Sequence, residues 1–87
     1  MGIKINKMLH AREDYNRFQD PDNKIPADEP VFLLRAQDIT APATLRFWAF
    51  QQRSNPKTNG KIITMVEQWA DKMEEWQKEH GSKFADL

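Results

Sequence analysis

The sequence has no cysteine, only three glycines, and no hydrophobic run long enough to cross a membrane. The lack of cysteine excludes a disulfide framework and a thiolate zinc site, two devices that often stabilise small domains. Glycines at positions 2, 60 and 81 are too far apart for a phosphate-binding loop. The first residues lack the apolar run of a signal peptide, so we expect a cytoplasmic protein with no membrane partner.

The formal net charge is zero, because thirteen Lys and Arg balance thirteen Asp and Glu over 87 residues. This balance argues against nucleic acid as a partner. The length predicts a single small domain over 1–87. Nine aromatic residues argue against a disordered chain. Without covalent staples, the core must be built from few large residues or be completed by a second copy of the chain.

Helical periodicity is clearest in the last third of the chain. Apolar residues recur there at spacings of 4, 3, 4 and 3, at Ile62, Val66, Trp69, Met73 and Trp76. This pattern predicts a long helix over 58–80, and Gly81 after it predicts the stop.

A second helix is predicted over 40–53. Thr40 suits the N-cap, and Pro42 is tolerated in a first turn. One face of this helix carries Ala41, Leu45, Trp48 and Ala49. Phe47 and Phe50 lie off that face, so they are either buried against the N-terminal region or exposed as a contact patch.

The apolar run at 31–36 has the length and flanks of a short strand. Residues 1–30 are polar and contain three prolines, which predicts an extended, loop-rich arm. The sequence therefore predicts an α+β fold with short strands packed on two helices. A single strand needs a partner, either residues 3–8 or the same strand of a second copy, so we expect a homo-oligomer. Alternatively, the two helices pack as a hairpin and their aromatic residues face a partner.

Two polar clusters are candidates for an anion site. One lies where the predicted strand leads into a helix, where backbone N–H groups attract anions and an arginine can bind phosphate. The other combines an imidazole, two guanidiniums and a phenol, which suits phosphates and a stackable ring. The predicted ligand-binding residues are Arg35, Gln37 and Asp38 in the first cluster and His10, Arg12, Tyr15 and Arg17 in the second. In the alternative reading, Asp38 caps the helix, Arg35 pairs with a local carboxylate, and 10–17 form an exposed turn.

Catalytic and metal-binding patterns are sparse. His10 and Asp14 have helical spacing, but no third metal ligand accompanies them. Ser54 and Ser82 lack the glycine-framed turn of a nucleophile. The sequence therefore predicts a non-enzymatic protein with no metal and no cofactor.

Several runs resemble a family of short phage and prophage proteins. They are residues 10–16, 25–38, the Ala41-Pro42 pair and 73–78, so the resemblance spans about residues 10–80. It implies a phage setting and the host cell cytoplasm, and it carries over no site residues. Small phage proteins of this kind often act by stoichiometric binding.

These observations lead to two expectations of function. The first is a counter-defence protein that sequesters a nucleotide-derived or other small anionic ligand. The alternative is a protein-binding module that inhibits a host enzyme or acts in virion assembly. This alternative predicts an exposed apolar patch formed by Phe47, Trp48 and Phe50.

Overall fold

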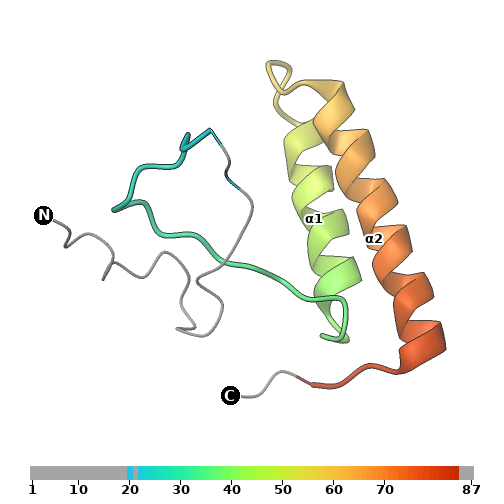
Figure 1. Cartoon of the computed structure of the whole chain (residues 1–87). Helices are drawn as coiled ribbons and strands as arrows, with labels where there is room; N and C mark the ends of the chain where they lie inside the picture. Colours follow the sequence, from blue (N-terminus) through green and yellow to red (C-terminus); the bar gives the residue numbers. More distant parts are fainter. Residues whose placement is uncertain (1–19, 21, 85–87) are drawn as a thin grey trace, which may run out of the picture. The chain divides into compact units, whose positions relative to one another are not determined.

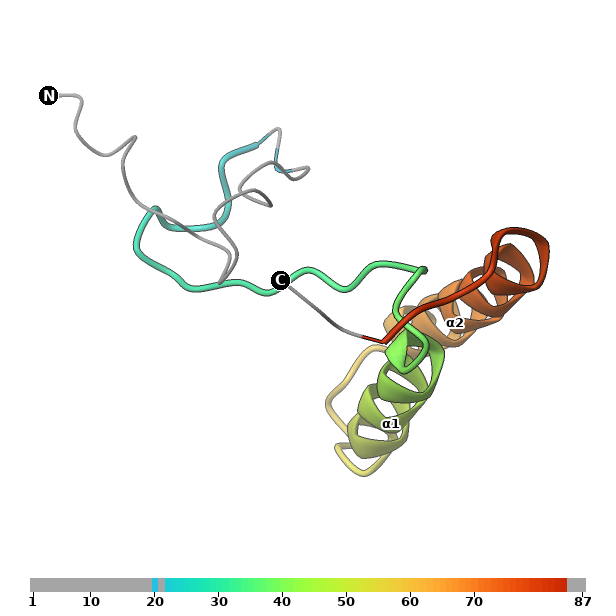
Figure 2. The same cartoon turned by 90° about the horizontal axis from the view of Figure 1, so that it is seen from below.

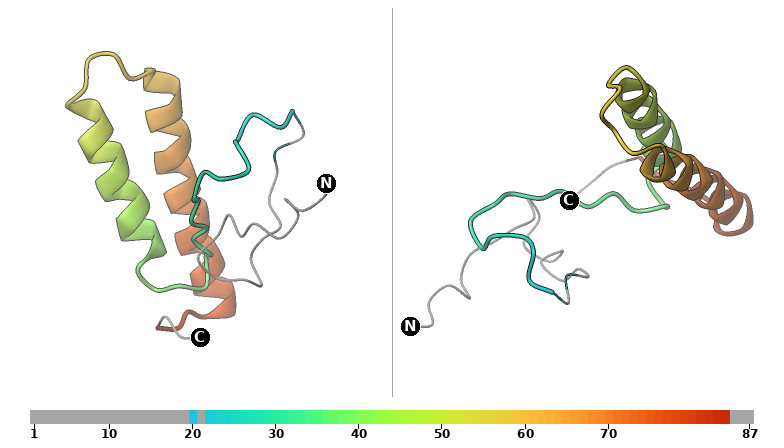
Figure 3. Two further views of the ribbon diagram at one scale, coloured as in Figure 1. Left: turned by 90° about the vertical axis from the view of Figure 1, so that its left-hand side faces the viewer. Right: turned by 90° about the horizontal axis from the view of Figure 1, so that it is seen from above.

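Two antiparallel helices dominate the computed structural model, which describes residues 20 and 22–84. Helix α1 spans Ala41–Arg53 and helix α2 spans Gly60–His80. They lie side by side and are joined at one end by residues 54–59, as Figure 1 and the left view of Figure 3 show. The helix predicted over 40–53 thus begins one residue later, and the one predicted over 58–80 begins at Gly60.

The prediction of an α+β fold is wrong for the part of the chain that the structure describes. That part has two helices and no strand, so it is all-α, and residues 31–36 form no strand. The run has the composition of a strand, but a strand also needs a hydrogen-bonded neighbour along its length. Instead the chain turns directly after it, and the N–H of Asp38 donates to the carbonyl of Arg35 at 3.0 Å.

A short return of the chain closes the open end of the hairpin. An isolated parallel bridge joins Asp38 and Lys83. The N–H of Ile39 donates to the carbonyl of Lys83 at 3.0 Å, and the N–H of Lys83 donates to the carbonyl of Gln37 at 2.8 Å. Figure 2 shows the segment after α2 running back to the start of α1. These bonds pair one residue with one residue, which is too short for a sheet.

The chain divides into two compact units, Met1–Leu33 and Leu34–Leu87. In the first unit, the Asp20 carboxylate accepts hydrogen bonds from the N–H groups of Lys24 and Ile25 at 3.0 and 3.2 Å. Asn23 has a φ of 51°, a conformation that asparagine tolerates better than most residues. The predicted arm over 1–30 lies mostly outside the described residues, and the single domain over 1–87 stays a prediction.

The helix ends follow local capping chemistry. The side chain of Asn59 accepts a hydrogen bond from the N–H of Lys61 at 2.8 Å and so caps the start of α2. Thr40 is the N-cap residue of α1 but makes no side-chain cap bond to that helix. After α2, Gly81 has a φ of 88° and its N–H donates to the carbonyl of Gln77 at 2.7 Å. Glycine adopts this left-handed backbone without steric cost, which explains the stop after His80.

The core between the helices is thin and consists mostly of alanine. Its buried hydrophobic side chains are Ala41, Ala49, Ile63 and Ala70, and the three alanines are fully buried. Small side chains let two helix axes approach closely. They also bury little apolar area, so this core contributes little hydrophobic stabilisation to the hairpin.

The apolar stripe predicted for α2 is not its buried row. The buried residues of α2 are Ile63 and Ala70, which lie outside the stripe. Within the stripe, Ile62, Val66 and Met73 are half-buried and Trp69 and Trp76 are exposed. At about 100° per residue, Trp69 is rotated away from the Ala70 row toward one edge of the helix. An indole ring does not fit between closely packed alanines, so it lies at that edge.

Candidate functional site

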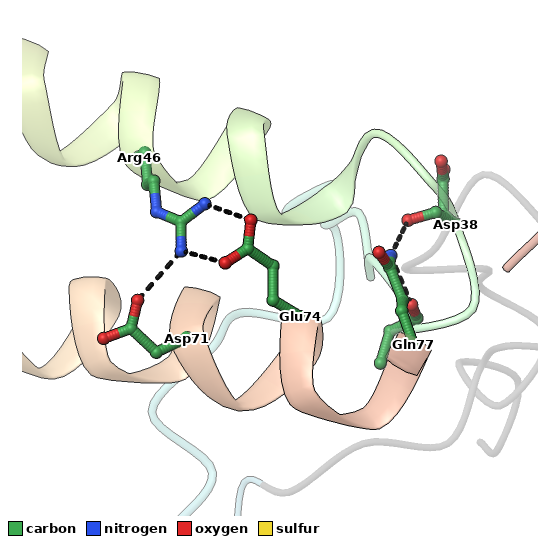
Figure 4. Close-up of polar contacts among 6 residues, drawn as sticks. Asp38, Arg46, Asp71, Glu74 and Gln77 are labelled. Atoms are coloured by element: carbon green, nitrogen blue, oxygen red, sulfur yellow. Dashed lines mark hydrogen bonds and ion pairs between the residues drawn. The ribbon is translucent and has the colours of Figure 1, made fainter. Parts of the chain in front are cut away.

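One face of the hairpin carries ion pairs between the helices. Arg46 donates two hydrogen bonds of 2.9 Å to Glu74 and a third of 2.8 Å to Asp71, as Figure 4 shows. Arg53 donates to both carboxylate oxygens of Glu67, one of them at 2.8 Å. We call these five residues the ion-pair face. Paired arginine–carboxylate bonds have a fixed geometry, so they fix the register of the two helices.

The hydrogen bonds from Arg46 lower the pKa of Glu74 below its usual 4.5, partly offset by desolvation and supported by the charges of Arg46 and Lys78. The bonds from Arg53 lower the pKa of Glu67 in the same way. Conversely, the carboxylates raise the pKa of both arginines. Both pairs lie at the surface, where water screens them, so their contribution to stability is small.

Acidification is therefore expected to weaken the hairpin slightly. Because the pKa values of Glu67 and Glu74 are lower in the folded chain, their contribution is present above pH 4.5 and is lost as the pH falls through the folded values. The arginines stay charged throughout and add no pH dependence. Urea unfolding from about pH 7 to about pH 3 should show this loss, and Arg46→Gln should flatten it. Equal pH slopes for the two proteins would contradict the assignment.

The tryptophans lie on the opposite face of the hairpin. In α1, Trp48 is rotated by about 100° to one side of the buried Ala49, and Arg46 by about 60° to the other side. In α2, Trp69 is rotated by about 100° to one side of the buried Ala70, and Glu74 by about 40° to the other. Since the helices are antiparallel and Arg46 meets Glu74, Trp48 and Trp69 share the face away from the ion pairs.

This second surface is apolar and largely exposed. The exposed fractions are 39% for Trp48, 47% for Met65, 52% for Trp69 and 40% for Trp76. We call these four residues the tryptophan face. Scattered apolar residues are normal on a protein surface, but several large ones on one face are typical of an interaction site.

Neighbouring side chains hold two of the indole rings in place. The ring of His80 stacks on Trp76, with centroids 4.3 Å apart and planes at 18°. The ammonium of Lys72 lies 4.4 Å from the ring centroid of Trp69, a cation–π distance. The edges of the tryptophan face are therefore polar, as the rim of a protein interface is.

A pair of phenylalanines forms a separate apolar feature on the outer side of α1. Phe47 and Phe50 are 61% and 66% exposed, and their ring centroids are 6.5 Å apart. Their spacing of three residues places them on neighbouring turns of one helix face. We call them the phenylalanine pair. Of the two readings that the sequence left open for these residues, the structure has them exposed.

In the predicted anion cluster at the start of α1, the side chain of Asp38 has a local structural role. The Asp38 carboxylate accepts hydrogen bonds from the N–H and the hydroxyl of Thr40, at 2.9 and 2.8 Å. It therefore closes the turn before α1 and does not cap the helix itself, whose N-cap residue is Thr40. The carbonyls of Arg35 and Gln37 accept hydrogen bonds from the backbone of Asp38 and Lys83. The second cluster, His10, Arg12, Tyr15 and Arg17, lies outside the described residues, so a meeting of the two clusters stays a prediction.

Sequence reasoning missed the role of Gln77. Its side-chain amide donates to the carbonyls of Ala36 and Asp38 at 2.9 and 2.8 Å, which ties the segment before α1 to the end of α2 (Figure 4). Gln77 lies seven residues after Ala70 on the same helix face, but the sequence pattern favoured the tryptophan row as the packed one and so gave no signal for this role. A polar residue on the packed row of a helix indicates a specific hydrogen-bond partner.

Two further kinds of feature are absent from residues 20 and 22–84. There, no three His, Asp or Glu side chains gather to hold a metal ion. Within the same residues, neither helix is apolar enough over a sufficient length to cross a membrane. Searches of family models, curated proteins and solved structures found no match to the chain. The resemblance to phage proteins therefore stays a prediction.

Proposed function

We propose that the protein is a non-enzymatic binding module whose partner is another protein. The observation that carries this proposal is the phenylalanine pair, which projects from α1 while the opposite side of that helix packs on α2. Aromatic anchors spaced by three or four residues are typical of helices that bind in an apolar groove. In this function, α1 inserts Phe47 and Phe50 into such a groove on the partner. A phage setting would make that partner a host enzyme or a virion component.

The polar side chains of the hairpin favour a protein partner over a small anion. The guanidiniums of Arg46 and Arg53 already form ion pairs with carboxylates of α2. The Asp38 carboxylate closes a turn. The exposed aromatic rings can contribute more binding energy than these polar groups, since aromatic side chains that become buried carry much of the energy of protein interfaces.

Substitution of the phenylalanine pair tests this function. Wild type, Phe47→Ser/Phe50→Ser and the exposed-site control Gln51→Ser would each be used to capture partners from the producing cell. For a partner identified with wild type, the double variant should raise the Kd about 30-fold, the loss expected for an interface hot spot of about 2 kcal/mol. Gln51→Ser should bind as wild type does.

Two results would contradict the proposal. One is a partner that binds the double variant as tightly as wild type. The other is a thermal shift produced by a nucleotide and abolished by Arg35→Ala, which would favour the anionic ligand expected from the sequence. Circular dichroism of each variant shows whether its helices are retained.

A further inference from the structure

We propose that the tryptophan face is the interface between two copies of this chain, which pair as a four-helix bundle with α2 antiparallel to α2 of the second copy. Two hairpins that bury one shared face give the two-fold symmetry that is commonest in homo-oligomers. The phenylalanine pair lies outside this face, so the inference does not depend on the proposed function.

The largest side chains of the hairpin lie outside its core. The core of the hairpin holds three alanines and one isoleucine, whereas Trp48, Trp69 and Trp76 are left partly outside it. An aromatic side chain presents about 150–250 Å², so the tryptophan face offers on the order of 400 Å² per copy. A standard interface buries about 800 Å² per partner. The rows beside the tryptophans, which carry Ile62 and Lys72 on α2, can supply the remainder.

The apolar pattern of α2 is symmetric about Trp69. Ile62, Trp69 and Trp76 are spaced seven residues apart, the repeat that lines the seam of paired helices. A two-fold axis near Trp69 with antiparallel α2 helices places Ile62 opposite Trp76 of the second copy. Each end of the seam then pairs a small side chain with a large one, which suits close packing.

The register of the hairpin places Trp48 of α1 close to the level of the two-fold axis at Trp69. Arg46 pairs with Glu74, and Arg53 pairs with Glu67. The numbers of two residues that lie at the same level on α1 and α2 therefore sum to about 120. Trp48 is then level with the residues just after Trp69. The axis that passes near Trp69 therefore also brings the two copies of Trp48 together, which places aromatic side chains at the centre of the interface, where binding energy concentrates.

Charged side chains at the two ends of α2 also favour antiparallel pairing. On α2, Lys61 and Glu79 lie 18 residues apart on the outer edge of the tryptophan face, one at each end of the helix. Neither has an ion-pair partner within the chain among the described residues. Antiparallel pairing places each Lys61 beside Glu79 of the second copy. Parallel pairing of the two α2 helices would place like charges together.

Sedimentation of the full chain tests the interface. Wild type should change from monomer to dimer as its concentration rises into the micromolar range. Trp69→Glu should stay monomeric with its helices retained, because Trp69 is half-exposed within one chain. The matched control Phe50→Glu should dimerise as wild type does. A wild type that is monomeric at every concentration, or a Trp69→Glu variant that still dimerises, would overturn the proposal.

A charge exchange tests the antiparallel arrangement. Lys61→Glu alone and Glu79→Lys alone each place like charges together twice in the dimer and should raise its Kd several-fold. The double variant Lys61→Glu/Glu79→Lys restores opposite charges and should return the Kd to within about twofold of wild type. A double variant as weak as the sum of the two single changes would overturn the antiparallel pairing.

Discussion

Replacement of Ala49 by leucine is expected to unfold most of the hairpin at room temperature. Ala49 is fully buried and lies at the level of Ala70, where the helices approach each other through alanine side chains. A larger side chain inserted into such a contact costs about 1–3 kcal/mol because the helices must separate. The thin core leaves little stability to absorb this loss. Circular dichroism at increasing urea concentration would measure the shift.

Ala43→Leu is the matched control for this change. Ala43 is exposed on the same helix, and the substitution adds the same atoms at nearly the same helix propensity. Its unfolding midpoint should lie close to that of wild type. Equal stability of the two leucine variants would mean that α1 and α2 do not pack through Ala49.

Replacement of Ile63 by alanine has the second large effect. Ile63 is the one large aliphatic side chain buried between the helices in the described part of the chain. Truncation of a buried isoleucine to alanine costs about 2–5 kcal/mol, and the lower end applies here because a surface hairpin can partly collapse into the gap. Measured in a Trp69→Glu background, where self-association does not contribute, the variant should lose most of its helical signal.

Met65→Ala in the same background provides the comparison. Met65 lies two residues away on α2 and is about half-exposed, so its truncation should change the unfolding free energy much less than that of Ile63. If Met65→Ala were the more damaging change, the packed face of α2 would be the one that carries the tryptophans, and the arrangement described above would be wrong.

Local signals in the sequence were sufficient to predict the two helices. The 3- and 4-residue spacing from Ile62 to Trp76 and the glycine at 81 place α2 to within two residues at either end. The strand over 31–36 was a wrong prediction because composition alone does not provide a neighbouring strand. Whether the run at 31–36 forms a strand depends on contacts far away in the sequence.

The packed face of α2 was harder to predict than the helix itself. Ile62, Trp69 and Trp76 fit a helical stripe as well as Ile63, Ala70 and Gln77 do, and hydrophobicity favours the tryptophans. The structure packs the smaller row, because Ala49 and Ala70 permit a close approach of the helices and Gln77 binds two backbone carbonyls. Steric fit between two helices is a pairwise property, and a single helical pattern does not contain it.

The candidate surface residues were predictable only in part from the sequence. The sequence placed Phe47 and Phe50 off the face of Ala41 and Ala49 and left open whether they are buried or exposed; the structure has them exposed. It also singled out Asp38, whose carboxylate closes the turn before α1, and its binding of a ligand stays a prediction. Polar side chains before a helix can close a turn or contact a ligand, so the residue type alone does not distinguish these two roles.

The account rests on one claim, that the hairpin buries its alanines internally and its tryptophans against a second copy. Distances between two spin labels test it most directly, because the chain has no cysteine and a single introduced one is labelled uniquely. Labels at Gln68→Cys should lie close together in the dimer, whereas labels at Lys61→Cys should be separated by about 24 Å along the helix axis, from a rise of 1.5 Å per residue. Short distances at both positions, or no measurable distance at either, would contradict the antiparallel pairing through the tryptophan face.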